Sequence, residues 1–456
     1  MKLRMLGILG VLALLFSFLS VSATSANSSI TVNPSASARV RIAHASPDAP
    51  PVDVYLNGVK KLAGVPFFTA SEYLYVPSGT VLVQVAAAGT PVSSSVISTS
   101  ITLLPDTSYT VAAVGELAAG TGTPISASVI TDEPIAPAAN NARVRVYHFS
   151  PGAPPVGVRI VSGATLASSV TYPAASSAVD ALAGTYTLEV FVAAAPTTIV
   201  STLTNVQFEA GKLYDLFAVG KLATGSPGGS PGDEAFRIET VVTDATAKVR
   251  IIHAAPSAPS VDVYVGDNKV LTNVPFFTVS DYLTLPAGQY RFRVTVTGQP
   301  LSSAIIDDTQ VLKVGQFYTI TAIAPTGSST TPVEAKISVE DFSTPTSGTS
   351  RVRVYHFSPG TPSVGVRVKG GPVLISSLSF PNISADIEIA AGTYDLEVFA
   401  TNNQTTLVTI SGVQLLPGKI LDIFATGQFP NVVLVSKYYS PGGLPGFRLS
   451  LPVVNT

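Results

Sequence analysis

Four histidines are the side chains of this sequence whose ordinary pKa lies closest to neutral, and the chain contains no cysteine. Each histidine lies in a near-copy of one phrase. The first copy, "RVRIAHASPDAPPVDVYLNG", begins at Arg39 and contains His44, and the other copies begin at Arg143, Lys248 and Arg351. A histidine followed by serine and aspartate, as in "HASPDAP", has the residue types of a serine-hydrolase triad, and histidine is also a common metal ligand.

The residues around the histidines argue against catalysis. A triad needs three side chains that meet in space, and residues two apart along a turn seldom meet. The partners also change between copies. Ser46 and Asp48 of the first copy give way to Gly152 at the aspartate position of the second, Ala255 at the serine position of the third and Gly360 at the aspartate position of the fourth. We therefore expect no catalytic residues and no enzyme activity, and hydrolysis is kept only as a remote alternative.

The spacing of potential metal ligands is equally unfavourable. Neither an H-x-H nor an H-E-x-x-H motif occurs, so one histidine per copy would need carboxylates or a second domain to bind a metal. The acidic pairs at 132–133 and 307–308 lack the spacing of a calcium loop, and we expect them to be solvated turn residues. No metal and no cofactor are expected.

A structural role fits the histidines better. Val40, Ile42 and His44 alternate with Arg39 and Arg41, so the histidine ends a predicted strand on its apolar face. The Pro-rich turn that follows leaves backbone groups without sheet partners, and a buried imidazole needs such a partner. We predict that a neutral histidine fastens this turn to the core in every copy, at His44, His148, His253 and His356.

The histidine positions also define the domain organisation. They are spaced by 104, 105 and 103 residues, at 44, 148, 253 and 356, which is the size of a whole domain. Odd copies share "VPFFT" and even copies share "RVRVYHFSPG", a pattern that indicates duplication of an ancestral pair. The predicted units are a signal peptide (1–26), two odd-type sandwiches (38–133 and 247–342) and two even-type sandwiches (142–244 and 350–456).

Within each copy, short runs of alternating apolar and polar residues are separated by Gly, Pro, Asp or Asn. About seven such runs in about 100 residues, without a helical period, predict an all-β fold of four tandem immunoglobulin-like antiparallel β-sandwich domains. The repeated phrase is expected to form the first hairpin of each sandwich. The joint between the second and third copies is little more than "DAT" at 244–246, so we expect a rod or a compact four-lobed array.

Composition limits the function classes further. Lys2, Arg4 and the apolar run of residues 6–19, followed by cut points after Ala23 or Ala26, have the pattern of a secretory signal peptide; a retained anchor is the alternative, but the run is short for a bilayer span. We therefore expect a secreted or cell-surface protein without a transmembrane anchor after cleavage. With 28 acidic and 26 basic residues, the chain has no basic excess that would indicate nucleic-acid binding.

The repeated motif resembles a known family. "RVRIAHASPDAPPVDVYLNG", followed by "VPFF", "YLYVPSGT" and "DTSYTVAAVG", is similar to bacterial secreted domains of the domain-of-unknown-function 4397 family, in four tandem copies. The even copies depart from the pattern, since Gly157 and Gly365 replace Asp53 and Asp262. The resemblance implies an extracytoplasmic β domain and no particular activity.

These observations favour a non-enzymatic structural or adhesive surface protein, with self-association or cell-envelope components as partners. The alternative is an extracellular ligand-binding module for glycans, since tyrosine can stack on sugar, although the chain has no tryptophan. One ring of each "VPFFT" pair is expected to point inward and the other outward or to a neighbouring domain. The predicted interface or ligand contacts are Phe67, Phe68, Phe276, Phe277, Tyr55, Tyr73 and Tyr75.

Overall fold

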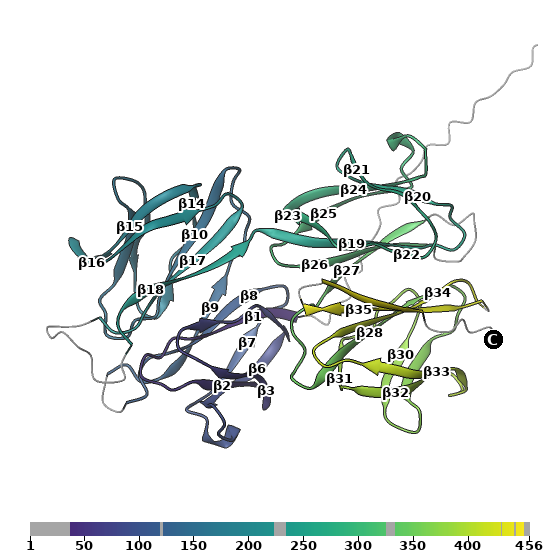
Figure 1. Cartoon of the computed structure of the whole chain (residues 1–456), viewed down its shortest axis with the longest axis horizontal. Coiled ribbons are helices and arrows are strands. Elements are labelled where there is room, and N and C mark those ends of the chain that lie inside the picture. The colour runs from purple at the N-terminus through teal and green to yellow at the C-terminus, as the bar shows by residue number, and fades with distance from the viewer. Residues whose placement is uncertain are drawn as a thin grey trace, which may run out of the picture.

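The computed structural model describes residues 37–118, 122–222, 234–324, 333–429 and 431–441, together with the backbone of 444–450. The predicted signal peptide and the "GGSPG" sequence at 228–232 lie outside these residues. Eight β-sheets are arranged as two sheets in each of four successive repeats, and Figure 1 shows the repeats as a compact two-by-two array. In the described part of the chain, no helix has the length and apolar character to cross a membrane.

The first repeat shows the common plan. One sheet has the order β4-β1-β8-β9, with β5 also paired to β1, and the other has the order β3-β2-β6-β7. The strands are β1 (Ser37–His44), β2 (Val52–Leu56), β3 (Val59–Val65), β4 (Thr69–Ala70), β5 (Leu74–Pro77), β6 (Gly79–Ala87), β7 (Ile97–Leu103), β8 (Ser108–Val114) and β9 (Ser126–Asp132).

The second and third repeats follow the same order of strands. The second has β10 (Asn141–His148), β11 (Val156–Ile160), β12 (Thr165–Val170), β13 (Ala174–Ala175), β14 (Val179–Leu182), β15 (Gly184–Val192), β16 (Ala195–Phe208), β17 (Lys212–Val219) and β18 (Arg237–Asp244). The third has β19 (Thr246–Ala254), β20 (Val261–Val265), β21 (Asn268–Val274), β22 (Thr278–Val279), β23 (Leu283–Pro286), β24 (Gly288–Val296), β25 (Ile306–Leu312), β26 (Phe317–Ile323) and β27 (Glu334–Glu340). The fourth has β28 (Thr349–Phe357), β29 (Val364–Val368), β30 (Val373–Leu378), β31 (Ile387–Ala390), β32 (Gly392–Ala400), β33 (Thr406–Leu415), β34 (Ile420–Thr426), β35 (Val433–Ser440) and β36 (Leu444–Ser450). In the fourth, an isolated bridge between Tyr355 and Ile383 takes the place of β4, and an additional strand, β36, pairs with β35.

The predicted fold class of tandem β-sandwiches is confirmed, and one detail of pairing was not anticipated. Each repeat has its own apolar core between its two sheets, as expected when one face of every strand is apolar. Most neighbouring strands are antiparallel. In each repeat, however, the first strand pairs in parallel with a later strand of its own sheet: β1 with β8, β10 with β17, β19 with β26 and β28 with β34.

The repeated phrase does not form a hairpin, so that expectation was wrong. β1 and β2 belong to different sheets, and the "SPDAPP" turn carries the chain from one sheet to the other. Pro47, Pro50 and Pro51 have no N–H to donate to a ladder, which disfavours direct pairing of the two strands across this turn. The turn therefore closes one end of the sandwich.

Each histidine lies at that end and contacts the turn. The Nε2 atoms of His44, His148 and His253 lie 3.1, 3.1 and 3.0 Å from the carbonyl oxygens of the proline six residues later, and that of His356 lies 3.3 Å away. Burial lowers the pKa of all four imidazoles below the ordinary value of 6.5. Each ring is therefore neutral at neutral pH and donates from Nε2 to the turn.

The odd repeats have an aspartate where the even repeats have a glycine, and a difference in side-chain packing explains the replacement. Asp53 is buried and accepts hydrogen bonds from Lys60 Nζ at 2.6 Å and from the backbone N–H groups of Gly64 and Gly89. In the even repeats the strand paired beside this position carries a phenylalanine. A Cβ on Gly365 would lie 2.2 Å from the Phe399 ring, so the ring occupies the space that the aspartate fills in the odd repeats.

Replacing a histidine with alanine should weaken the turn. In His253→Ala the carbonyl of Pro259 loses its donor, and a hydrogen bond of this kind contributes about 0.5–1.5 kcal/mol to stability. We expect a lower melting temperature and faster amide exchange confined to residues 254–261, measured by hydrogen exchange and mass spectrometry. Unchanged exchange in that turn would contradict this role.

The same histidines make stability depend on pH. Since their pKa is lower in the folded state, the unfolded chain binds more protons once the pH falls below 6.5. The free energy of unfolding should therefore decrease between about pH 7 and about pH 5, and His253→Ala should reduce the slope, as measured by urea denaturation. An unchanged slope would show that His253 does not titrate differently on folding.

The Gly–Phe pair can be tested by a double-mutant cycle. Gly365→Ala should destabilise the chain by about 1–3 kcal/mol through overpacking against Phe399. Phe399→Ala should reduce the additional cost of Gly365→Ala, because it removes the clashing ring. Additive effects on the free energy of unfolding would contradict the proposed steric coupling.

Candidate functional site

The most unusual side chains of the structure are arginines buried between repeats. Along β1, Val40 and Ile42 face the core, whereas Arg39 and Arg41 face the opposite side of the sheet. That side is covered by other repeats, the second at Arg41 and the third at Arg39, so both arginines are buried between domains. The equivalent arginine of the third repeat, Arg250, is also buried.

The first junction is built around Arg41. Its Nη1 donates to Asp215 Oδ2 of the second repeat at 2.6 Å, and its Nε and Nη2 donate to Thr110 Oγ1 at 3.1 and 2.8 Å. Nη2 also donates to the hydroxyl of Tyr147 at 3.2 Å and lies 3.8 Å from Asp132 Oδ2. The guanidinium thus connects two acidic groups from different repeats.

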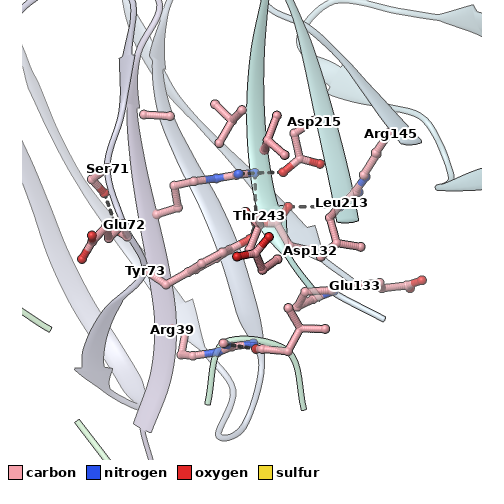
Figure 2. Close-up of a pocket in the computed structure, with 18 of the residues that line it drawn as sticks. Arg39, Ser71, Glu72, Tyr73, Asp132, Glu133, Arg145, Leu213, Asp215 and Thr243 are labelled. Atoms are coloured by element: carbon pink, nitrogen blue, oxygen red, sulfur yellow. Dashed lines mark hydrogen bonds and ion pairs between the residues drawn. The ribbon is translucent and has the colours of Figure 1, made fainter. Parts of the chain in front are cut away.

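Asp132 completes this first network. It accepts hydrogen bonds from the hydroxyl groups of Tyr73 at 2.8 Å and Tyr147 at 2.7 Å, and from Arg145 Nη1 at 3.1 Å. Figure 2 shows Asp132, Asp215 and Tyr73 converging beside one another from both repeats. Asp132 was expected to be a solvated turn residue, and this was wrong: its side chain is only 3% exposed because the second repeat covers it.

The second junction repeats the arrangement with more contacts. Arg250 Nη2 donates to Glu340 Oε2 and Asp422 Oδ2, both at 2.8 Å, and to the hydroxyl of Tyr355 at 2.6 Å. Its Nη1 donates to the hydroxyl of Tyr439 at 2.5 Å. The side chains of Arg250, Glu340 and Asp422 are 0–1% exposed, so this cluster is excluded from water.

The charges in these networks stabilise one another. Burial alone would lower the pKa of Arg41 and Arg250, but the neighbouring carboxylates outweigh burial and raise both. Burial opposes ionisation of Glu340 as well, yet Arg250 and Arg353 lower its pKa to about 2. At Asp215 burial dominates and the pKa is raised. Each central arginine is therefore kept charged by one carboxylate from its own repeat and one from the next.

Apolar clusters lie beside the ion networks. Ala43, Ala112, Tyr147, Phe149 and Phe217 form a cluster that joins the first two repeats. The Tyr147 and Phe217 rings are stacked with centroids 4.4 Å apart, and their counterparts in the second pair, Tyr355 and Phe424, have the same separation. Aromatic packing and buried ion pairs thus act together at each junction.

The structure places the predicted phenylalanines at these junctions. Phe68 packs on Phe217, with ring centroids 5.1 Å apart, and Phe277 packs on Phe424 at 6.0 Å. The other ring of each pair contacts the histidine of its own repeat, since Phe67 lies 6.1 Å from His44. Phe276 lies 6.2 Å from His253 in the same edge-on geometry.

Two of the three predicted tyrosines, Tyr73 and Tyr75, line a cavity between repeats, whereas Tyr55 does not. Tyr55 is buried, with Lys60 Nζ 5.4 Å from its ring centroid. The guanidinium groups of Arg39 and Arg41 lie 5.2 and 5.3 Å from the centroid of Tyr73, which Figure 2 shows extending between repeats. The hydroxyl of Tyr75 is buried without a hydrogen-bond partner.

A cavity of about 470 Å³ opens beside the first network (Figure 2). Residues of the first, second and third repeats line it, including Tyr73, Asp215, Thr243 and Val314. Arg39 spans its edge, donating to the carbonyl of Val314 at 2.6 Å and so linking the first repeat to the third. Sequence reasoning missed this site, although two arginines on one strand face of a chain with 12% charged residues were a signal for it.

The histidine phrase does not assemble a nucleophile with a base. Ser46 Oγ donates to Asp48 Oδ1 at 3.3 Å, while His44 Nε2 contacts a backbone carbonyl. Within the described ranges, no group of three or more His, Asp or Glu side chains is placed to hold a metal ion. The buried polar residues that the structure describes form inter-repeat contacts beside the cavity of about 470 Å³ and beside a second one of about 660 Å³, which residues of the first, third and fourth repeats line.

Breaking a network by removing its central charge should destabilise the chain strongly. Arg250→Met leaves only the more distant Arg353 to balance the buried Glu340 and Asp422, and breaking a buried ion pair in this way costs about 3–5 kcal/mol. Adding Glu340→Gln and Asp422→Asn to this variant should recover part of the loss, measured as the free energy of unfolding.

Arg291→Met is the matched control, because Arg291 pairs with Asp307 at an exposed site and its side chain is 56% exposed. This change should cost at most about 1 kcal/mol. Equal losses for the two single variants would contradict a special role of the buried cluster.

Comparison with known proteins places the chain in a family. The family model described as "Domain of unknown function (DUF4397)" matches residues 38–159, 247–367 and 350–438. None of the curated proteins matches the chain. A solved structure, the Bacillus anthracis TIE protein, is 10% identical over 83% of this chain and 66% of its own length, with a TM-score of 0.15. Because the three matched segments together cover more than half of the sequence, the chain belongs to the DUF4397 family.

Proposed function

We propose that this protein is a non-enzymatic, extracytoplasmic structural or adhesive protein that presents four β-sandwiches as one rigid body. The observation that carries the proposal is the pair of buried ion clusters around Arg41 and Arg250. A buried charge is tolerated only where its partners are held in good geometry. Sliding or hinging within an odd–even pair would separate these charges, so each pair is held in one arrangement.

Contacts between the two pairs support the same proposal. Arg39 donates to the carbonyl of Val314, and Leu213, Ala245 and Val314 form a small apolar cluster between the second and third repeats. β18 ends at Asp244 and β19 begins at Thr246, which leaves a single residue as linker. A rigid array of this kind fixes the spacing of its surface loops, a useful property for a spacer or an adhesive surface protein.

The proposal of a non-enzymatic role rests on where the reactive groups lie. The neutral histidines contact turn carbonyls, and the carboxylates of the junctions are engaged by arginines and tyrosines. Secretion is part of the proposal and rests on the leader-like pattern at residues 1–26.

Small-angle scattering tests the rigid array. The chain without residues 1–26 should give a scattering profile that, extrapolated to zero concentration, matches the two-by-two arrangement. Arg39→Ala removes the contact with Val314 and should increase the radius of gyration, whereas the exposed control Arg291→Ala should not.

A profile of extended, independently moving domains in the unmodified chain would contradict the proposal. The adhesive role is tested separately by co-sedimentation with purified cell-envelope fragments, by self-association in sedimentation velocity and by a glycan array. Specific glycan binding without either of the other two would favour the alternative of a glycan-binding module.

A further inference from the structure

The two odd–even junctions are duplicates, and one of them lacks side chains that the other has. Strand register gives the correspondence: Leu213 pairs with Thr243, and Ile420 pairs with Tyr439. Thr243 therefore takes the place of Tyr439. In the same way Asp132 and Glu340 are equivalent, because they pair with the first residues of β8 and β26.

Two further ring positions follow from that register. Pro134 lies two residues after Asp132 and corresponds to Phe342, and Ser108 corresponds to Phe317. At the second junction Phe342 has ring contacts with Phe317 at 4.9 Å and Tyr439 at 5.3 Å. Together with Ile420 these rings form an apolar cluster, and one side of Phe317 and Phe342 also lines the cavity beside the first junction.

At the first junction the corresponding space is open. Thr243, Pro134, Leu213 and Tyr73, the counterparts of residues in that aromatic cluster, line the cavity of about 470 Å³. A volume of this size is in the range of small-molecule sites, at about 300–1,000 Å³. The side chain of Asp215 is 17% exposed, whereas that of its counterpart Asp422 is 0% exposed.

The polar groups that line the cavity indicate which hydrogen bonds a bound molecule could make there. At the second junction the phenolic hydroxyl of Tyr439 accepts a hydrogen bond from Arg250 Nη1. Arg41 Nη1, the equivalent atom, donates instead to Asp215 Oδ2. Two buried polar atoms of lining residues have no hydrogen-bond partner in the structure: the hydroxyl of Tyr75 and Nε of Arg143.

We propose that the cavity at the first junction is a binding site for a phenolic ring, which would take the place that Tyr439 fills at the second junction. The ring would pack among Pro134, Leu213 and Thr243. Its hydroxyl would accept from Arg41 and donate to Asp215. A sugar fits less well, because the guanidinium groups of Arg39 and Arg41 lie against the Tyr73 ring. The source of the phenol is either a tyrosine of a partner polypeptide or a free phenolic compound.

Ligand-observed NMR with the chain lacking residues 1–26 tests this site. p-Cresol should bind with a Kd of about 1 mM, as expected for a ligand of its size, and toluene, which lacks the hydroxyl, about tenfold more weakly. N-acetyl-tyrosinamide distinguishes the sources: tighter binding than p-cresol indicates a tyrosine of a polypeptide, and weaker or equal binding indicates a free phenol.

A larger side chain at Thr243, which lines the cavity, provides a second test of the site. Thr243→Tyr supplies the side chain of the second junction and should abolish binding of p-cresol, and the less bulky Thr243→Met should weaken it at least tenfold. Thr240→Tyr, at an exposed position of the same strand, is the control and should bind as the unmodified chain does. Melting temperatures show whether each variant is folded. If one of the two Thr243 variants does not fold, the other can still decide the test.

Three results would overturn the proposal: no binding of any phenol, equal affinity for toluene and p-cresol, or undiminished binding by the folded Thr243 variants. Tighter binding of methyl glucoside than of p-cresol would also overturn it. These outcomes are independent of the rigid array, which scattering tests without any ligand.

Discussion

Arg250 lies between the third and fourth repeats with its side chain fully buried, in a chain where only 12% of residues are charged. Transferring a guanidinium group from water to such a site costs several kcal/mol unless its N–H groups find acceptors. Glu340 comes from its own repeat, whereas Tyr355, Asp422 and Tyr439 come from the next one. The third repeat can therefore bury Arg250 in this way only when the fourth is docked in one orientation. The same constraint applies to Arg41 and makes the odd–even pair, rather than the single sandwich, the structural unit.

The duplicated junctions show how one arrangement has diverged. The ion cluster is kept in both, with an arginine from the first strand of the odd repeat and carboxylates from the two repeats. The surroundings differ, because Phe342 and Tyr439 pack in an aromatic cluster at the second junction, while their counterparts Pro134 and Thr243 line a cavity at the first. An aromatic cluster and a cavity thus occupy equivalent backbone positions.

Much of the single repeat was predictable from the sequence. Period-two alternation in runs such as Val40–His44 identified the strands and their core face, and the histidine spacing identified the repeats. The repeated motif also identified the family. The parallel pairing of β1 with β8, and the passage of the chain from one sheet to the other after His44, were not predictable, because alternation records which face is buried and not which strand lies alongside.

The junctions were harder to predict for a related reason. Arg41, Asp132 and Asp215 are far apart in the sequence, and each alone has the residue type of a solvated surface. Such residues are buried only when a second domain covers them, so the pattern of apolar and polar residues within one repeat does not predict their burial. The sequence showed that Gly157 replaces Asp53, but the reason lies in the cross-strand partner Phe191, whose ring occupies the space of the aspartate.

Because the chain has no cysteine, pairs of introduced cysteines can carry spin labels at chosen sites, and distances between them test the central claim directly. Exposed positions suitable for labelling are Leu104, Leu182, Val311 and Val373, one in each repeat. Pulsed electron–electron double resonance should give a single narrow distance distribution for every pair of these positions, as expected for four domains in one fixed array. Broad distributions between the repeats of an odd–even pair would contradict the claim that buried ion clusters hold each pair in one arrangement.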